Sequence, residues 1–174
     1  MSETEKNLRA AFAGESQANR RYLAFAQKAA DEYREGVYKL FMAVAEAETI
    51  HALRHLSNLK EIKGTEDNLK AAIAGEMHEF KSMYPEMVSK AKEENMRAAE
   101  ITLSHAMEVE KVHHALFNEA LENLDDFPVR DYYICPGCGH TAANEPPERC
   151  PVCGAVGKTY YKAGSVKGPG ILNI

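Results

Sequence analysis

Cysteine is missing from the first 134 of the 174 residues, and all four cysteines lie in the last 40. Proline is almost as scarce in the first part, which contains only Pro85, whereas six prolines follow residue 124. The first part is rich in Ala, Glu, Lys, Leu and Met, a composition typical of long helices. A boundary between two kinds of structure is therefore expected near residues 125–130.

A surplus of basic residues is also lacking, because 26 acidic side chains outnumber 21 basic ones and the net charge is -5. This balance argues against binding to nucleic acid or to an anionic membrane surface. No apolar run approaches the length of a membrane span, and the polar, acidic amino terminus does not resemble a secretory signal. We therefore expect a soluble cytoplasmic protein, in which four cysteines are poor candidates for disulfides.

Breaks in the helical pattern at 34–36, 63–65 and 90–95 divide the first part into four segments. The expected bounds of these helices are 4–34, 37–62, 66–90 and 95–124. Four helices joined by short turns favour an antiparallel bundle. Pro85 should bend or interrupt the third helix, because it lacks an amide hydrogen and clashes with the preceding turn.

Each of the four predicted helices carries a glutamate within its apolar stripe, namely Glu15, Glu48, Glu76 and Glu110. Burying an unpaired carboxylate among apolar side chains costs several kcal/mol. Lysine and arginine are absent from these stripes, so histidine is the only basic side chain that could neutralise the charges. A metal cation between the helices is the remaining way to neutralise the buried carboxylates.

The spacing of these glutamates matches a dinuclear metal site. Two helices carry Glu-x-x-His pairs, at 48–51 and 110–113, and the two side chains of each pair project from one helix face. The pairs follow the single glutamates by 33 and 34 residues, as in an internal repeat of one helical hairpin. A bundle-core di-iron or di-manganese site takes this set of side chains. The six candidate ligands are Glu15, Glu48, His51, Glu76, Glu110 and His113.

A further glutamate, Glu79, lies one turn beyond Glu76 and near the same face. It is either a seventh ligand or a carboxylate at the edge of the stripe. Five glutamates and two neutral histidines would set about five negative charges against the four or more positive charges of two metal ions. Mixed carboxylate and imidazole ligation suits iron or manganese.

Two Cys-x-x-Cys knuckles, at 135–138 and 150–153, are separated by eleven residues, which lets four thiolates surround one ion. A segment this short, with few large aliphatic residues, needs a metal in order to fold. A tetrahedral site of four thiolates suits zinc, which would be structural, and also a single iron, which can carry one electron. The spacing alone leaves this choice open.

Several motifs taken together resemble the rubrerythrin family. They are Ala-Phe-Ala-Gly-Glu-Ser-Gln-Ala at 11–18, Glu-Thr-Ile-His at 48–51, Ala-Gly-Glu-Met-His-Glu at 74–79, Met-Tyr-Pro-Glu-Met at 83–87, Glu-Lys-Val-His at 110–113 and the paired Cys-Pro-x-Cys-Gly knuckles. The resemblance runs from about residue 4 to 165. It implies a mainly α protein, with a ferritin-like di-iron four-helix bundle at 1–128 and a small rubredoxin-like iron-binding β module at 129–174.

The resemblance also implies roles for individual residues. Glu48 and Glu110 would be the bridging carboxylates, and one iron would move between Glu79 and His51 when the redox state changes. The implied di-iron ligands are Glu15, Glu48, His51, Glu76, Glu79, Glu110 and His113. The implied ligands of the mononuclear iron are Cys135, Cys138, Cys150 and Cys153.

Two aromatic residues, Tyr22 and Tyr84, resemble tyrosines near the di-iron centre of the family. Each of them also suits the aromatic part of a helical core. The tail, residues 167–174, is the part of the chain that the resemblance explains least.

For the activity, the resemblance implies a non-haem di-iron peroxidase that reduces hydrogen peroxide to water in oxidative stress defence. Electrons would pass from the rubredoxin-like iron to the di-iron pair. Because no G-x-G-x-x-G motif follows a predicted strand, an external reductase or rubredoxin, linked to NADH, would supply them. A homodimer or higher homo-oligomer is expected. The alternatives are a ferroxidase or iron-handling protein of the ferritin type, and a zinc-ribbon binding protein with structural metals in the bundle.

Overall fold

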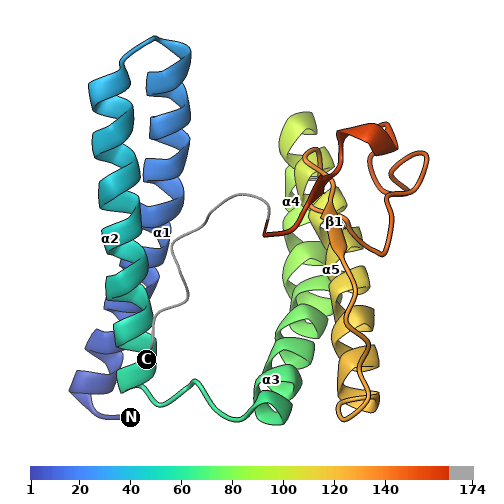
Figure 1. The fold of residues 1–174 in the computed structure, drawn as a ribbon, viewed down its shortest axis with the longest axis horizontal. Helices are drawn as coiled ribbons and strands as arrows, with labels where there is room; N and C mark the ends of the chain where they lie inside the picture. Colours follow the sequence, from blue (N-terminus) through green and yellow to red (C-terminus); the bar gives the residue numbers. More distant parts are fainter. Residues whose placement is uncertain (165–174) are drawn as a thin grey trace. The chain divides into compact units, whose positions relative to one another are not determined.

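The structure is a computed structural model that describes residues 1–164, and Figure 1 shows the course of the chain. The helices are α1 (Glu3–Asp31), α2 (Glu35–Asn58), α3 (Thr65–His78), α4 (Tyr84–Glu93) and α5 (Arg97–Glu122), and the strands are β1 (Tyr132–Ile134), β2 (Thr141–Ala143) and β3 (Tyr161–Lys162). The expected mainly α fold with a small β module near its carboxyl end is confirmed. Within the described residues, no helix combines the length and the apolar character needed to cross a membrane.

Three of the helices end in the same kind of cap, although the capping residues are not glycines. Tyr33, Lys60 and Asn95 have φ angles of 57°, 57° and 56°, the left-handed conformation common one residue beyond a helix C-cap. After α2, the amides of Lys60 and Glu61 donate to carbonyl oxygens of the last turn at 2.9 and 3.4 Å. These are the two bonds of a Schellman motif, which ends the helix and turns the chain sharply.

The third predicted helix is interrupted, as expected from Pro85. A π-helical turn, Glu79–Met83, joins α3 to α4, and Pro85 follows in the first turn of α4. Proline cannot donate the backbone hydrogen bond that a continuous helix would need at this position. A π-helical turn closes its hydrogen bond over one more residue than an α-turn. The side chains that follow Glu79 therefore face a direction that a continuous α-helix would not give them.

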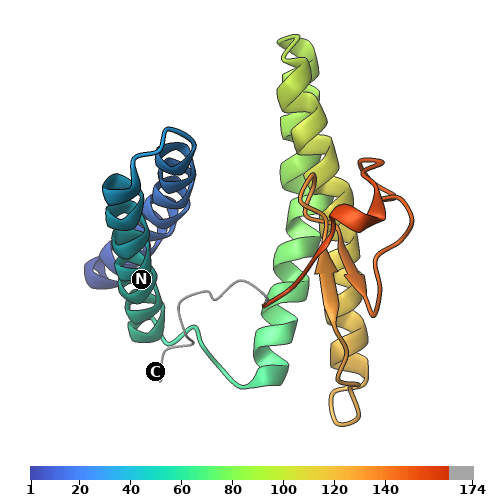
Figure 2. The same cartoon turned by 45° about the horizontal axis from the view of Figure 1, so that its top comes forward.

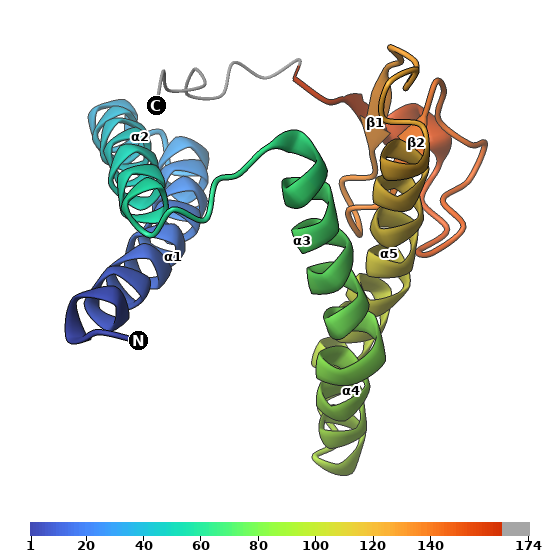
Figure 3. The same cartoon turned by 90° about the horizontal axis from the view of Figure 1, so that it is seen from below.

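The described residues form two compact units. The first unit ends at Lys63 and consists of the α1–α2 hairpin. The second unit begins at Gly64 and contains α3, α4, α5 and the four-cysteine module. Figures 2 and 3 show that in this second unit α3 and α4 run along α5, and that the module also lies against α5. The domain division at residue 128 stays a prediction, and the tail at 167–174 lies outside the described residues.

Small residues make up the buried interior of the helices. The first unit buries Asn19, Ala26, Ala29, Ala45 and Ala52, and the helices of the second bury Val88, Ala91 and Val109. The Nδ2 atom of Asn19 donates to the Ala45 carbonyl oxygen at 2.6 Å and to Thr49 Oγ1 at 2.9 Å, which joins α1 to α2. No Leu, Ile, Phe or Met among residues 1–164 is buried. The large apolar side chains of the helices therefore remain partly open.

The four-cysteine module is a three-stranded antiparallel sheet with the order β2-β1-β3. Ile134 of β1 lies opposite Thr141 of β2 and opposite Tyr161 of β3. The buried core of the module consists of Cys135, Cys150 and Tyr160. Cysteines thus occupy the place that large aliphatic residues take in larger domains, which is expected of a fold that depends on a metal.

Candidate metal centres

One cluster of candidate ligands, the first half-site, lies on the α1–α2 hairpin. Glu15 of α1 and Glu48 and His51 of α2 offer ligand atoms that all lie within 4.8 Å of one another. The Nδ1 atom of His51 is 2.9 Å from Glu48 Oε2. His51 follows Glu48 by three residues, so both side chains project from the same face of α2. The first half-site therefore presents two carboxylates and one imidazole nitrogen to a common point.

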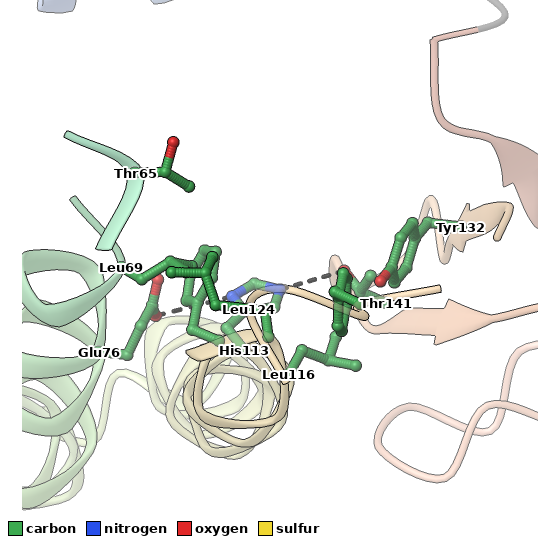
Figure 4. Close-up of a pocket in the computed structure, with 11 residues that line it drawn as sticks. Thr65, Leu69, Glu76, His113, Leu116, Leu124, Tyr132 and Thr141 are labelled. Atoms are coloured by element: carbon green, nitrogen blue, oxygen red, sulfur yellow. Dashed lines mark hydrogen bonds and ion pairs between the residues drawn. The ribbon is translucent and has the colours of Figure 1, made fainter. Parts of the chain in front are cut away.

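A matching cluster, the second half-site, lies between α3 and α5. Glu76 of α3 and Glu110 and His113 of α5 offer ligand atoms within 4.8 Å of one another. The Nδ1 atom of His113 is 2.7 Å from Glu110 Oε2 and 3.7 Å from Glu76 Oε2. Figure 4 shows Glu76 and His113 facing each other from their two helices. The internal repeat in the sequence thus corresponds to two similar clusters of one single glutamate and one Glu-x-x-His pair.

The acidic side chains of the second half-site shift the pKa values of their neighbours. Burial raises the pKa of the Glu76 carboxyl, and the hydrogen bond and charge of Glu110 raise it further, against a smaller opposite effect of His113. Burial also raises the pKa of the Tyr84 hydroxyl, and the charges of nearby glutamates, Glu110 first, add to that shift. Carboxylates this close together disfavour each other's ionisation unless an opposite charge is present. The donor set therefore fits a cation.

The seventh predicted ligand and the two tyrosines lie at different distances from these clusters. Glu79 is the half-buried first residue of the π-helical turn and belongs to neither half-site, although its charge contributes to the raised pKa of Tyr84. Tyr84 is therefore close to the second half-site. The ring of Tyr22 packs 6.3 Å from that of Phe25 and 6.1 Å from that of Phe41, measured between centroids. Tyr22 thus forms part of an aromatic cluster on the α1–α2 hairpin.

Thr141 of the module is a site residue that the sequence did not reveal. Its Oγ1 lies 3.1 Å from Nε2 of His113, and it donates its own proton to the Gly139 carbonyl oxygen at 3.3 Å. A hydroxyl has one proton, so Thr141 can accept a hydrogen bond from His113 when the ring carries its proton on Nε2. In that tautomer Nδ1 of His113 keeps the lone pair with which it would bind a metal, and Thr141 holds the opposite side of the ring.

The four cysteines converge on one point of the module. Cys135 Sγ is 3.6 Å from Cys153 Sγ, and Cys138 Sγ is 3.4 Å from Cys150 Sγ. Four sulfurs at about 2.3 Å from a central ion in a tetrahedron lie about 3.8 Å apart. A disulfide would require a sulfur separation of about 2.05 Å. The sulfur positions therefore fit a tetrahedral thiolate site and exclude paired disulfides.

The two knuckles have the same backbone geometry. Gly139 and Gly154 have φ angles of 85° and 76°, and their amides donate to the carbonyl oxygens of Cys135 and Cys150, both at 2.9 Å. Glycine adopts this left-handed conformation without steric cost, which explains the glycine after each Cys-x-x-Cys pair. At Gly137, a β-carbon would lie 3.3 Å from Cys153 Sγ, so the missing side chain leaves space for the sulfur.

Hydrogen-bond donors around Cys150 favour its thiolate. Burial alone would raise the pKa of this thiol, but the amides of Cys153 and Val152 and the Tyr160 hydroxyl outweigh burial and lower the pKa to about 6. Burial raises the pKa of Cys138 and of Cys153. A metal ion favours the deprotonated form of every coordinating thiol. The donor set around the sulfurs is therefore suited to a cation rather than to four free thiols.

Comparison with known proteins decides the family. The family model for rubrerythrin matches residues 6–121, which include both half-sites. The chain belongs to the rubrerythrin family. Rubrerythrin-2 of Clostridium acetobutylicum is 38% identical over 90% of this chain and 94% of that protein. Nigerythrin of Nitratidesulfovibrio vulgaris is 33% identical over 86% of this chain and 81% of that protein.

A solved structure extends the likeness to the fold. The fully reduced, all-ferrous state of nigerythrin aligns with a TM-score of 0.57 and 30% identity, over 93% of this chain and 87% of that one. The chain therefore combines helices of the ferritin-like kind with a rubredoxin-like module, as the sequence predicts. Proteins of the family hold two non-haem irons in the bundle and one iron at the four cysteines, and the donor atoms described above fit both groups.

Proposed function

We propose that this protein is a non-haem di-iron peroxidase that reduces hydrogen peroxide to water in defence against oxidative stress. The observation that carries the proposal is the 3.1 Å contact between His113 of the bundle and Thr141 of the four-cysteine module. It links the second half-site and a candidate one-electron centre within one compact unit. A storage protein of the ferritin type has no need of such a link.

The proposed iron ligands are those expected from the sequence. Glu48 and Glu110 would hold the irons of the dinuclear site, and Glu79 or His51 would supply a further ligand. The position of Glu79 outside the second half-site, yet close enough to act on Tyr84, is consistent with a ligand used in only one state. The remaining bundle ligands are Glu15, Glu76 and His113, and the four cysteines hold the mononuclear iron.

When bound, the irons supply the two electrons that convert one hydrogen peroxide and two protons into two molecules of water. The chain prepares the site for this reaction through its own side chains. Thr141 fixes the ring of His113 with Nδ1 toward the carboxylates, and the glutamates balance the positive charge in a half-buried setting. The amides around Cys150 stabilise negative charge on its sulfur.

The electrons have to come from another protein. We propose a rubredoxin or a reductase, in a chain that begins with NADH, as the donor to the four-cysteine site. We also propose that the protein works in the cytoplasm, because a reducing compartment keeps the four cysteines available as metal ligands.

The test is a rapid-mixing experiment on the iron-loaded protein. The wild type is reduced with dithionite, mixed with hydrogen peroxide or with oxygen, and followed through the visible absorption of the four-thiolate iron. A Glu110→Ala variant removes a bundle ligand and leaves the cysteines intact. Glu108→Ala, on the same helix but exposed and paired with Lys111, is the matched control.

We expect the absorption to return rapidly with peroxide in the wild type and in Glu108→Ala, and far more slowly in Glu110→Ala. Equal rates in all three proteins would mean that peroxide reacts at the cysteine site, which would overturn the proposal. A much faster return with oxygen than with peroxide would favour the ferroxidase function instead.

A further inference from the structure

Tyr160 is a buried tyrosine that packs against two of the four cysteines. Together with Cys135 and Cys150 it forms the buried core of the module. Burial raises the pKa of its hydroxyl, and the hydrogen bond to Cys150 and the charge of that thiolate raise the pKa further. The Tyr160 hydroxyl therefore keeps its proton, and this proton is available for a hydrogen bond to a sulfur.

The hydroxyl of Tyr160 has a second partner, the side chain of His140. Its oxygen lies 3.0 Å from Nδ1 of His140, and the two rings meet edge to face with their centroids 6.1 Å apart. Both residues are only 8% exposed. The backbone of His140 is fixed as well, because its carbonyl oxygen accepts a hydrogen bond from the Cys135 amide at 2.9 Å. His140 thus connects the first knuckle to a tyrosine that contacts the second.

The tyrosine cannot donate to both partners, because a phenol hydroxyl has one proton. A coordinating thiol is deprotonated by its metal, so the sulfur of Cys150 carries negative charge when the site is loaded. Hydrogen bonds to charged acceptors are about twice as strong as hydrogen bonds to neutral ones. We therefore expect the hydroxyl to donate to Cys150, and its oxygen to accept from His140 when that ring carries a proton on Nδ1.

A hydroxyl directed at a sulfur ligand affects the two oxidation states of an iron site unequally. Reduction adds one negative charge, part of which is carried by the four sulfurs. A hydrogen-bond donor therefore stabilises the reduced state more than the oxidised state, which raises the reduction potential. The effect is strong at a buried position, because water screens the interaction little there.

We propose that Tyr160, held in place by His140, raises the reduction potential of the iron at the four cysteines. Tyr160 is the donor to Cys150, and His140 is a positioning residue that acts through the tyrosine. During reduction an electron passes from the external donor protein to the site, while the hydroxyl keeps its proton and only its hydrogen bond becomes stronger. This inference rests on the proposed function, because it concerns the electron-carrying iron assigned there, and it adds the residues that adjust that iron to its donor.

The reduction potential can be measured on the full-length, iron-loaded protein. The protein is titrated with dithionite in the presence of redox dyes and followed through the visible absorption of the four-thiolate iron. Tyr160→Phe keeps the ring and removes the hydroxyl. Tyr161→Phe is the matched control, because Tyr161 is the next residue of the chain and is 46% exposed. His140→Leu removes the partner of the hydroxyl, whereas His140→Asn keeps an N–H donor near the position of Nδ1.

We expect Tyr160→Phe to shift the equilibrium toward the oxidised iron by about tenfold, which lowers the potential of a one-electron couple by about 59 mV. Tyr161→Phe should keep the potential of the wild type. His140→Leu should lower the potential, and His140→Asn should restore most of the loss. The double variant Tyr160→Phe/His140→Leu should match Tyr160→Phe alone, because His140 acts through the hydroxyl.

Three results would contradict the proposal. An unchanged potential in Tyr160→Phe would show that the hydroxyl does not act on the iron site. A higher potential in His140→Leu would show that the wild-type hydroxyl donates to His140 instead of Cys150. A double variant with the sum of the two single effects would show that His140 acts independently of Tyr160, so its positioning role would be wrong.

Each variant is first checked for the visible absorption of the four-thiolate iron. If Tyr160→Phe does not retain iron, the comparison of His140→Leu with His140→Asn decides, because both variants keep the tyrosine. Equal potentials in these two variants would then refute the positioning role. Peroxide takes no part in the measurement, so a wrong peroxidase assignment would leave the potentials unchanged. A wild-type module without a reducible absorption would instead refute the iron assignment, and this proposal with it.

Discussion

Thr141 and His113 are in hydrogen-bond contact, with Oγ1 and Nε2 3.1 Å apart. The two residues are 28 positions apart in the sequence. Thr141 is the first residue of β2 in the module, and His113 lies in α5. The contact would orient a proposed iron ligand from the side of the four-cysteine module. Interactions that orient a metal-binding histidine through its second nitrogen affect metal affinity strongly.

Replacing Thr141 with valine should therefore weaken iron binding in the bundle. The side chain keeps its size but loses the hydroxyl, so the ring of His113 loses its acceptor. We expect the affinity for bundle iron to fall by about 10- to 100-fold, measured by competition with a chelator. Thr102→Val is the control. Thr102 lies on α5, the helix that carries His113, and its exposed hydroxyl donates to the Ala98 carbonyl oxygen of the same helix. Equal affinities for the two variants would show that Thr141 does not position His113.

Replacing one cysteine should abolish iron binding at the module without unfolding the helices. In a Cys150→Ser variant, the module loses a thiolate that the surrounding amides and the Tyr160 hydroxyl stabilise, and one of its three core residues. We expect the visible absorption of the four-thiolate iron to disappear, with about one iron fewer per chain. Circular dichroism should retain the helical signal, since the helices are formed by other parts of the chain.

The control for this change is Val152→Ala, which alters the same knuckle and keeps all four sulfurs. Val152 is half-buried against the module core. This variant should keep its visible absorption. If Cys150→Ser kept the absorption too, the proposed role of that sulfur as an iron ligand would be wrong.

A glycine of the module should be intolerant of substitution for a steric reason. A β-carbon at Gly157 would overlap the carbonyl oxygen of Pro147, which is backbone and cannot move aside. The Gly157 amide also donates to the Glu148 carbonyl oxygen at 2.7 Å, so the two segments are held close together. We expect Gly157→Ala to destabilise the module and to release its iron at much lower chelator concentrations than the wild type. Gly36→Ala, where nothing lies near the added carbon, should leave iron release unchanged.

The grouping of six of the predicted bundle ligands into clusters was predictable because much of it is local. A glutamate and a histidine three positions apart share a helix face in any α-helix, so the pairs at 48–51 and 110–113 required no knowledge of the tertiary structure. The same holds for the two Cys-x-x-Cys knuckles, in which the spacing of the cysteines and the glycine that follows each pair determine the local turn. The interruption at Pro85 was also predictable, because it follows from the chemistry of one residue.

Other features depend on contacts that no short pattern encodes. The bond from His113 to Thr141 exists only because the module lies against α5, and a single threonine in a short strand gives no signal of it. Glu79 belongs to neither half-site, although it follows Glu76 by about one helical turn, because sharing a helix face does not by itself bring a side chain to the common point. The left-handed caps at Tyr33 and Lys60 were hidden because neither residue is typical of that conformation.

Asn19 should stabilise the α1–α2 hairpin more than any of the alanines around it. Its side chain is buried and its amide donates to the Ala45 carbonyl oxygen and to Thr49 Oγ1, so it connects two helices whose other buried residues are alanines. Asn19→Ala removes both bonds and leaves a small cavity. We expect the free energy of unfolding to fall by about 1–3 kcal/mol, measured by urea denaturation of the metal-free protein at fixed concentration. Asn58→Ala, whose exposed side chain bonds only to its own helix, should change the free energy of unfolding by less than about 0.5 kcal/mol. Equal effects of the two substitutions would mean that the buried amide does not hold the hairpin together.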